Sequence, residues 1–110
     1  MPKIERARAI ALSEFGGLGL LVDDHAWPDK RRFAYKTHGS SGELAKAYLA
    51  LLERLKSFIS KGLSAAVYTQ LTDVEGEING LVTYDREVLK IDEGMLVAAH
   101  EALLATGKAA

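Results

Sequence analysis

The sequence contains no cysteine, and only two of its 110 residues are proline. The lack of cysteine excludes a disulfide scaffold and a thiolate metal site, and it fits a reducing compartment, so we expect a cytoplasmic protein. No apolar run approaches the ~20 residues that span a bilayer, and mixed charge at the N-terminus gives no sign of a signal peptide. The 14 basic and 15 acidic residues leave a net charge of −1. This balance predicts no nucleic-acid partner and no membrane partner.

The composition is that of a globular protein, with 48% apolar and 26% charged residues. Residues 9–14 and 65–71 are short apolar runs, a pattern typical of strands buried on both faces. Residues 15–40 form a long irregular stretch that is rich in glycine and carries Trp27, Phe33 and Tyr35. Because long ordered loops are uncommon and tend to be functional, we expect this one to order against an apolar surface.

Two helices are predicted from their end signals. Ser40 and Glu43 fit a capping box that begins the first helix, and Lys61-Gly62 is a suitable end. Asp92 can cap the second helix, which ends near Gly107. The apolar stripe expected on the first helix consists of Leu44, Tyr48, Leu51, Leu52, Leu55, Phe58 and Ile59. The inner face expected on the second consists of Met95, Leu96, Ala99, Leu103 and Leu104.

The predicted order is strand, long loop, helix, strand, loop and helix, with a short extended piece over residues 81–84. This is a βαβα unit, whose two strands are parallel. A parallel strand normally has neighbours on both edges and helices on both faces. We therefore expect the chain to be part of a larger α/β sheet or barrel.

Polar residues follow both predicted strands, at the position where parallel α/β folds bind ligands. The first strand ends in Ser13-Glu14, and the second in Thr69-Gln70 with Asp73 close behind. A carboxylate at the end of an apolar strand is partly desolvated, so Glu14 is a candidate nucleophile or proton carrier. The alternative is that Glu14 is simply the first solvated residue after the strand.

His25 and Trp27 alternate in the long loop, where they could line a sugar pocket; burial in a loop core is equally plausible for Trp27. The three histidines are too scattered for a metal pair on one helix. The acidic alternation after Asp73 invites a calcium-loop interpretation, but the last position of the ~12-residue loop, which needs a bidentate Glu, is Arg86. We expect no metal and no cofactor.

Two sequence segments carry a more specific functional signal than these patterns. Residues 12–17 read Leu-Ser-Glu-Phe-Gly-Gly, and residues 65–86 contain Val-Tyr-Thr-Gln and Asn-Gly-Leu-Val-Thr-Tyr-Asp-Arg. They resemble, respectively, the nucleophile segment and the last barrel strand with its following loop in glycoside hydrolase family 2. That family includes β-galactosidases, β-glucuronidases and β-mannosidases. The resemblance covers about residues 9–92.

The resemblance implies that residues 1–110 are a C-terminal fragment of a (β/α)8 TIM barrel: strand 7, helix 7, strand 8 and helix 8, incomplete as a barrel. It implies a hydrolase of carbohydrate metabolism, a retaining β-glycosidase with Glu14 as the nucleophile. The candidate substrate-binding residues are His25, Trp27, Tyr68, Gln70 and Asp73.

The sequence departs from the family in one decisive respect. Family members carry the acid/base as the Glu of an Asn-Glu pair after strand four, but the single asparagine here, Asn79, is followed by Gly80. A complete barrel also takes ~250 residues. We therefore expect the isolated chain to lack meaningful activity, and to self-associate or to be complemented by the missing strands. β-Glucuronidases resemble each other in an Asn-x-Lys pair just before the loop glycine, whereas residues 77–79 here read Glu-Ile-Asn. The missing basic residue and the acid in this segment disfavour a glucuronide substrate.

Two other functions stay open. The chain could be a non-catalytic module that binds carbohydrate or assembles with a barrel piece. It could also be a small free-standing α/β domain with an unrelated ligand.

Overall fold

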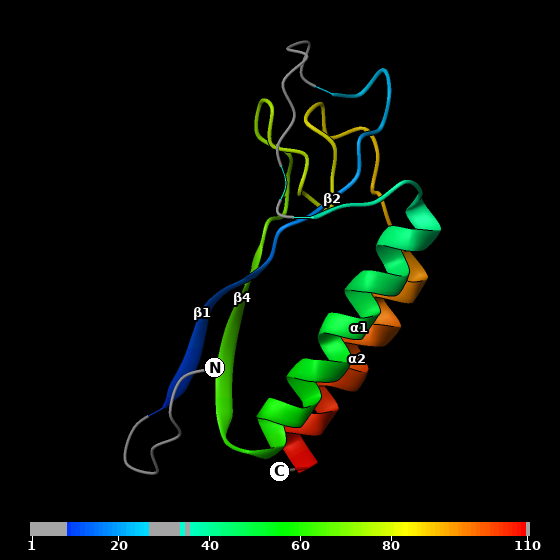
Figure 1. The fold of residues 1–110 in the computed structure, drawn as a ribbon. Coiled ribbons are helices and arrows are strands. Elements are labelled where there is room, and N and C mark those ends of the chain that lie inside the picture. The colour runs from blue at the N-terminus through cyan, green and yellow to red at the C-terminus, as the bar shows by residue number, and fades with distance from the viewer. Residues whose placement is uncertain (1–8, 27–33, 35, 110) are drawn as a thin grey trace.

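The structure, a computed structural model, describes residues 9–26, 34 and 36–109, with side chains as far as 107. Two long helices, α1 (Ser41–Ser60) and α2 (Glu93–Ala109), stand beside a parallel pair of strands, β1 (Ile10–Gly16) and β4 (Leu63–Thr69). The loops gather at one end of this assembly (Figure 1). Within that end, β2 (Leu18–Gly19) pairs in parallel with β3 (Lys36–Thr37).

Strand β1 contains a bulge just before its C-terminal end. Leu12 pairs with Ala66 and Phe15 pairs with Tyr68, so β1 uses one residue more than β4 between the two pairs. Residues three apart on a regular strand point to opposite faces. Here Leu12 and Phe15 both pack against the hydrophobic core. The bulge therefore adds one residue at 13–14 and turns the chain between them.

The two ends of α1 follow the predicted signals. Ser40 Oγ accepts a hydrogen bond from the N–H of Glu43 at 3.1 Å, and Glu43 Oε2 accepts from the N–H of Gly39 at 2.9 Å. At the other end the N–H groups of Lys61 and Gly62 donate to the last turn, and Gly62 has φ of 113°. Because the left-handed region disfavours a Cβ, glycine is the natural residue at this exit.

The core lies between one face of the sheet and the two helices. Helix α1 contributes the buried Leu44, Ala45, Tyr48, Leu52 and Leu55, and the strands contribute Ile10 and Leu63. Helix α2 packs along α1 through Leu96, Ala99 and Leu103. The expected inner face of α2 was wrong at two positions, because Met95 is 41% exposed and Leu104 is 67% exposed.

The α/β class, with parallel strands and two helices, is confirmed. Three boundaries needed correction. The first strand continues to Gly16, the second spans Leu63–Thr69 instead of 65–71, and residues 81–84 form no strand. Val82 instead makes isolated bridges to Thr72 and Leu89, because the polar loop folds on itself through single backbone contacts. The pairing of β2 with β3, inside the predicted long loop, was missed because two-residue strands carry no periodicity.

Candidate functional site

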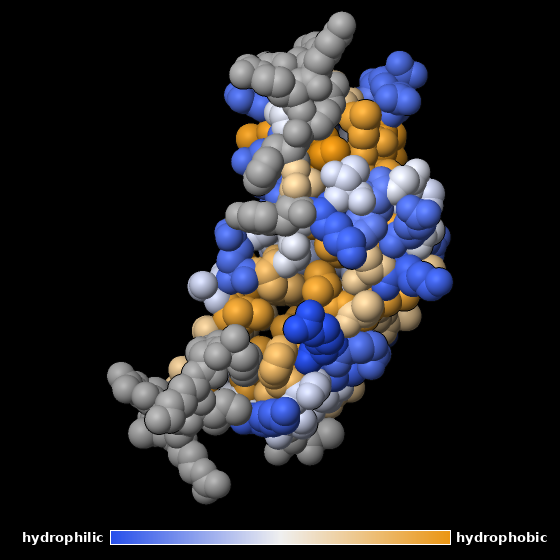
Figure 2. Space-filling view, in the orientation of Figure 1, coloured by the Kyte–Doolittle hydropathy of each residue, from blue (hydrophilic) through white to orange (hydrophobic). Residues whose placement is uncertain are grey.

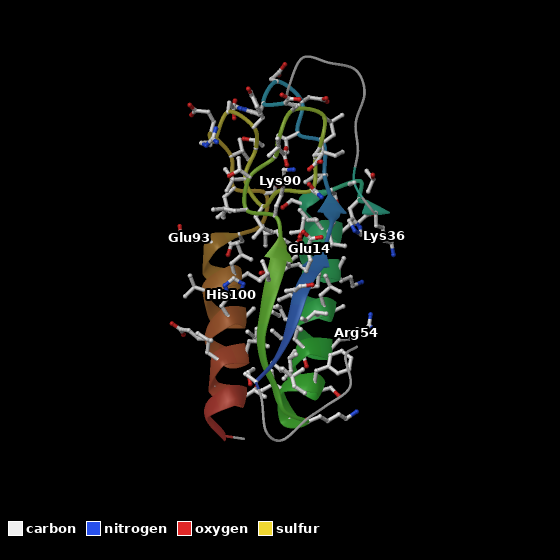
Figure 3. All side chains as sticks on the ribbon, turned by 90° about the vertical axis from the view of Figure 1, so that its left-hand side faces the viewer. Glu14, Lys36, Arg54, Lys90, Glu93 and His100 are labelled. Carbon is white, nitrogen blue, oxygen red and sulfur yellow. The ribbon has the colours of Figure 1, made fainter. Side chains whose placement is uncertain are left out.

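The candidate site lies at the C-terminal ends of β1 and β4, beneath the loops. Glu14 occupies the bulge of β1 and is exposed, whereas Leu12 and Phe15 on either side of it are half-buried. Figure 3 shows the strands in front of α1, with Glu14 near their upper ends. The partial desolvation expected for this carboxylate is therefore wrong, because the bulge turns it away from the core.

A close backbone approach fixes the segment that follows Glu14. Gly16 has φ of 108°, and a Cβ there would lie 2.5 Å from the Tyr68 ring and 2.9 Å from the carbonyl oxygen of Thr69. The N–H of Gly17 donates to that same carbonyl at 2.8 Å. A side chain at position 16 would push β1 away from β4, so glycine sets the position of Glu14 relative to the second strand.

Tyr68 belongs to the packed side of the sheet. Its ring makes edge-to-face contacts with Phe15 at 5.2 Å and with Tyr48 at 5.0 Å between centroids. Its hydroxyl is buried and has no hydrogen-bond partner among the described residues. Burial raises the pKa of Tyr68, and the neighbouring Tyr48 adds to the increase. Its placement therefore gives Tyr68 a packing role, behind the strand and not beside Glu14.

Gln70 follows β4 directly and organises the loop beyond it. Its amide nitrogen donates to Asn79 Oδ1 at 2.7 Å and to Glu77 Oε2 at 3.0 Å. The peptide bond between Thr69 and Gln70 is cis. Both N–H groups of the Gln70 amide thus bind side chains of the loop over residues 72–80, which we call the acidic loop. These two contacts draw the acidic loop back over the end of β4.

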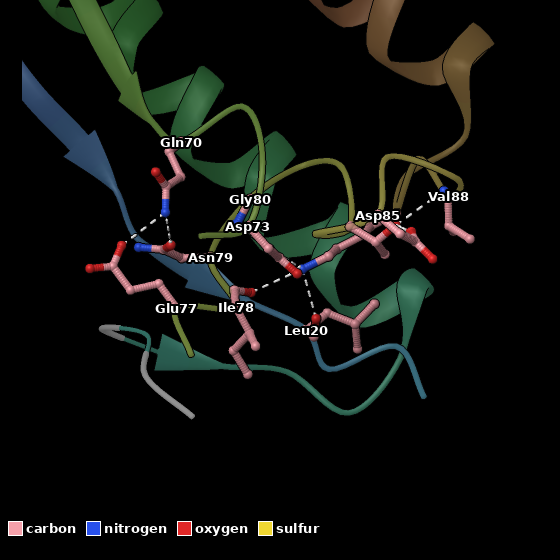
Figure 4. Close-up of polar contacts among 11 residues, drawn as sticks. Leu20, Gln70, Asp73, Glu77, Ile78, Asn79, Gly80, Asp85 and Val88 are labelled. Carbon is pink, nitrogen blue, oxygen red and sulfur yellow. Dashed lines mark hydrogen bonds and ion pairs between the residues drawn. The ribbon is translucent and has the colours of Figure 1, made fainter. Parts of the chain in front are cut away.

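Asp73 lies inside the same loop, in a buried ion pair with Lys90 (Figure 4). Lys90 Nζ lies 2.7 Å from Asp73 Oδ1, and it also donates to the carbonyls of Leu20 at 2.7 Å and Ile78 at 3.0 Å. The N–H of Gly80 donates to the same Asp73 oxygen at 2.8 Å. We call Lys90, Asp73 and the groups they bind the lysine hub.

The lysine hub joins segments that are far apart in the sequence. It connects the end of β2, the loop after β4 and the segment before α2. In addition, the Ser41 hydroxyl at the start of α1 donates a hydrogen bond to the Lys90 carbonyl. Burial lowers the pKa of Lys90, and Asp73 opposes this by stabilising the charged form. Three acceptors satisfy the three ammonium donors, which is the condition for burying such a charge.

His25 lies at the outer side of the loops. Its Nδ1 is 2.7 Å from Asp85 Oδ2, and both side chains are about one-third exposed. Hydrogen bonds from the Thr83 hydroxyl, the Glu87 N–H and His25 lower the pKa of Asp85 from 3.8 to about 2. Trp27 lies outside the described residues.

The structure thus brings Glu14, Gln70 and Asp73 to the same end of the sheet, but gives them different surroundings. Glu14 is exposed, Gln70 is half-buried and Asp73 is buried. Lys90 was missed in the sequence. The one available signal was its position between Leu89 and Ile91, which suggests a buried stem but does not identify a partner for the ammonium group.

No protein-family model matches the chain, and no curated protein matches it significantly. Among the described residues, no three or more His, Asp or Glu side chains form a group able to hold a metal ion. None of the helices in these same ranges has the length and apolar character needed to cross a membrane.

Proposed function

We propose that the chain is the C-terminal βαβα part of a (β/α)8 barrel from a retaining β-glycosidase, with Glu14 as the nucleophile. The observation that supports it best is the bulge of β1. It presents an exposed carboxylate near the C-terminal end of a parallel strand, directly before the half-buried Phe15. Bulges often re-aim side chains next to active sites, and ligands of parallel α/β folds bind at this end of the strands.

In the proposed reaction, an oxygen of Glu14 attacks the anomeric carbon of a β-glycoside and the bond to the leaving oxygen breaks. A covalent glycosyl-enzyme forms, and water later releases the sugar with net retention. A second carboxylic acid ~5 Å away protonates the leaving group in such enzymes. The proposal places this acid on the missing part of the barrel, so the isolated chain should lack the ~10²–10⁴-fold benefit of general acid catalysis.

The candidate binding residues divide by their surroundings. His25 and Gln70 keep partly exposed side chains at the loop end, so we assign them to sugar contacts in the completed site. Asp73 and Tyr68 are engaged by the lysine hub and by aromatic packing. In the proposed enzyme these two residues support the loop and the strand behind the sugar.

The test combines complementation with a substrate that needs no acid. The chain is mixed with a polypeptide carrying the first six strands of a family 2 barrel, and the mixture is incubated with a 2-fluoro-glycosyl fluoride. Fluoride leaves without protonation, while the 2-fluoro group slows hydrolysis of the covalent intermediate. Intact-protein and peptide mass spectrometry then show whether a fluoro-sugar is attached, and at which residue.

We expect labelling at Glu14, none in Glu14→Gln, and unchanged labelling in the control Glu93→Gln, which changes an acid in the first turn of α2. Turnover of aryl β-glycosides by the chain alone, abolished by Glu14→Gln, would contradict the predicted inactivity. Binding of glycans by the chain alone, without labelling of Glu14 in the complemented mixture, would favour the non-catalytic module.

A further inference from the structure

An open groove lies between β4 and the two helices. It has a volume of about 990 Å³ and is lined by residues of four elements, including Phe15 of β1, Ala66 and Tyr68 of β4, Leu55 and Ile59 of α1, and Leu103 and Leu104 of α2. In Figure 3, α2 stands beyond the edge of β4 that β1 does not occupy, while α1 lies behind the strands. Figure 2 shows hydrophobic side chains gathered between the strands and the helices.

The backbone of β4 is available for pairing along this groove. Within the described residues, β4 pairs with β1 alone, and β1 pairs with β4 alone. As far as the described residues go, each strand therefore has one edge whose N–H and C=O groups are unpaired, which is a template for another strand. Parallel sheets occur almost only with their faces covered and several strands side by side.

The residue distribution of helix α2 is also that of a helix covered on more than one side. It is apolar around most of its circumference, yet Val97 is 49% exposed and Leu104 is 67% exposed. A helix that is hydrophobic all round is normally buried. Since α1 covers one side, the groove between α2 and β4 is where a further strand would bury another.

We propose that this groove binds β1 of a second copy of the chain, whose free edge pairs in parallel with β4 of the first. The two strands match, because each is seven residues long and the same two strands already pair in parallel within one copy. Repeating that arrangement places Leu12 of the second copy beneath α2 of the first. The groove thus continues the sheet between copies.

An added strand would cover apolar surface that the groove leaves open, including Leu104, which is 67% exposed. The contact is head-to-tail, so it extends until a ring closes. An eight-stranded parallel barrel would close with about four copies.

The first test measures mass in solution by analytical ultracentrifugation over a range of concentrations. We expect the chain to be larger than a monomer. Leu104→Glu, which places a charge in the groove, should weaken association at least tenfold, and Leu71→Glu should leave it unchanged. Leu71 is the matched control because it is also an exposed leucine, 71% exposed in the loop after β4, and does not line the groove.

The second test uses the absence of native cysteine. Chains with Ala11→Cys on β1 and differently tagged chains with Ala65→Cys on β4 are mixed and oxidised. Because Ala11 and Ala65 are register partners within one copy, head-to-tail assembly should give cross-links between the two kinds of chain. Each variant alone should give few, whereas a two-fold symmetric dimer would cross-link one variant alone.

Three outcomes would overturn the proposal. The chain could be a monomer, its oligomer could be unchanged by Leu104→Glu, or cross-links could form only between chains that carry the same cysteine. If Leu104→Glu loses its helical circular dichroism, the cross-linking result decides. The outcome is separate from that of the proposed glycosidase function, because the chain can self-associate without ever labelling at Glu14. If both proposals hold, the complementing polypeptide should compete with self-association for the same groove.

Discussion

The loop end of the molecule combines buried polar groups with buried apolar residues such as Leu81 and Ile91, whereas the strand-and-helix half is stabilised by apolar packing. At the loop end Asp73, Asn79, Thr83 and Lys90 are buried, and single hydrogen bonds connect distant segments. In the other half the buried residues are apolar, but the groove leaves one side open. The difference teaches that specific polar contacts hold the end with candidate chemistry, whereas the half that supports it has the unfilled surface.

The largest effect should come from breaking the lysine hub. Lys90→Met keeps a long side chain but leaves the carboxylate of Asp73 buried without its cation. Removing one partner of a buried ion pair typically costs about 3–5 kcal/mol of unfolding free energy. Urea unfolding followed by circular dichroism measures this loss.

The matched control is Lys56→Met, which removes a lysine that pairs with Glu53 on the surface of α1 at 2.8 Å. Exposed ion pairs are worth about 0–1 kcal/mol. Equal losses in the two variants would show that the hub contributes nothing beyond an ordinary surface pair, and the contrast between the two ends would disappear.

The corresponding change in the apolar half is Leu44→Ala. Leu44 is fully buried near the start of α1, and truncating such a leucine typically costs about 2–5 kcal/mol, depending on how far the cavity collapses. Leu71→Ala, at a residue that is 71% exposed, should cost less than about 0.5 kcal/mol. Differential scanning calorimetry on both variants gives the comparison. A loss below 1 kcal/mol for Leu44→Ala would mean that this half is loosely packed.

A smaller loss is expected for Gly80→Ala, which tests how tightly the acidic loop is folded. A Cβ at position 80 would lie 2.2 Å from the backbone nitrogen of Asp73, and backbone cannot rotate away as a side chain can. Overpacking of this kind costs about 1–3 kcal/mol. Gly42→Ala, in the first turn of α1 where the nearest atom is 3.9 Å away, should instead stabilise by about 0.5–1 kcal/mol. Stabilisation by Gly80→Ala would contradict the close packing.

The sequence predicts the apolar half better than the loop end, and the reason is physical. The capping box at Ser40 and the stripe on α1 are local patterns that directly reflect helix geometry, so these predictions are confirmed. The hub depends on Lys90 reaching Asp73, Leu20 and Ile78, and such distant contacts leave no periodicity in the chain.

The candidate site was predictable in part for the same reason. The position of Glu14 near the end of a strand follows from a short apolar run, but its exposure does not. Exposure comes from the bulge, which depends on the pairing with β4 and on the close approach at Gly16. Likewise, the free edge of β4 follows from how many strands the chain holds, whereas the groove requires the position of α2.

The smallest effect concerns pH at the exposed edge of the loop end, where Asp85 accepts hydrogen bonds from Thr83 and Glu87 and contacts His25. The folded pKa of about 2 lies below the ordinary 3.8. The unfolded chain therefore binds the proton more readily than the folded chain. Asp85 stabilises the folded loop fully above pH 3.8, and this stabilisation is lost as the pH falls through about 2.

NMR titration of the Asp85 carboxyl carbon should give a midpoint near 2. The amide signal of Glu87 should shift over the same pH range, and Asp85→Asn should remove the shift of the Glu87 amide. A midpoint near 3.8 would show that the polar contacts at this edge are open in solution, and that the polar order of the loop end is confined to the buried lysine hub.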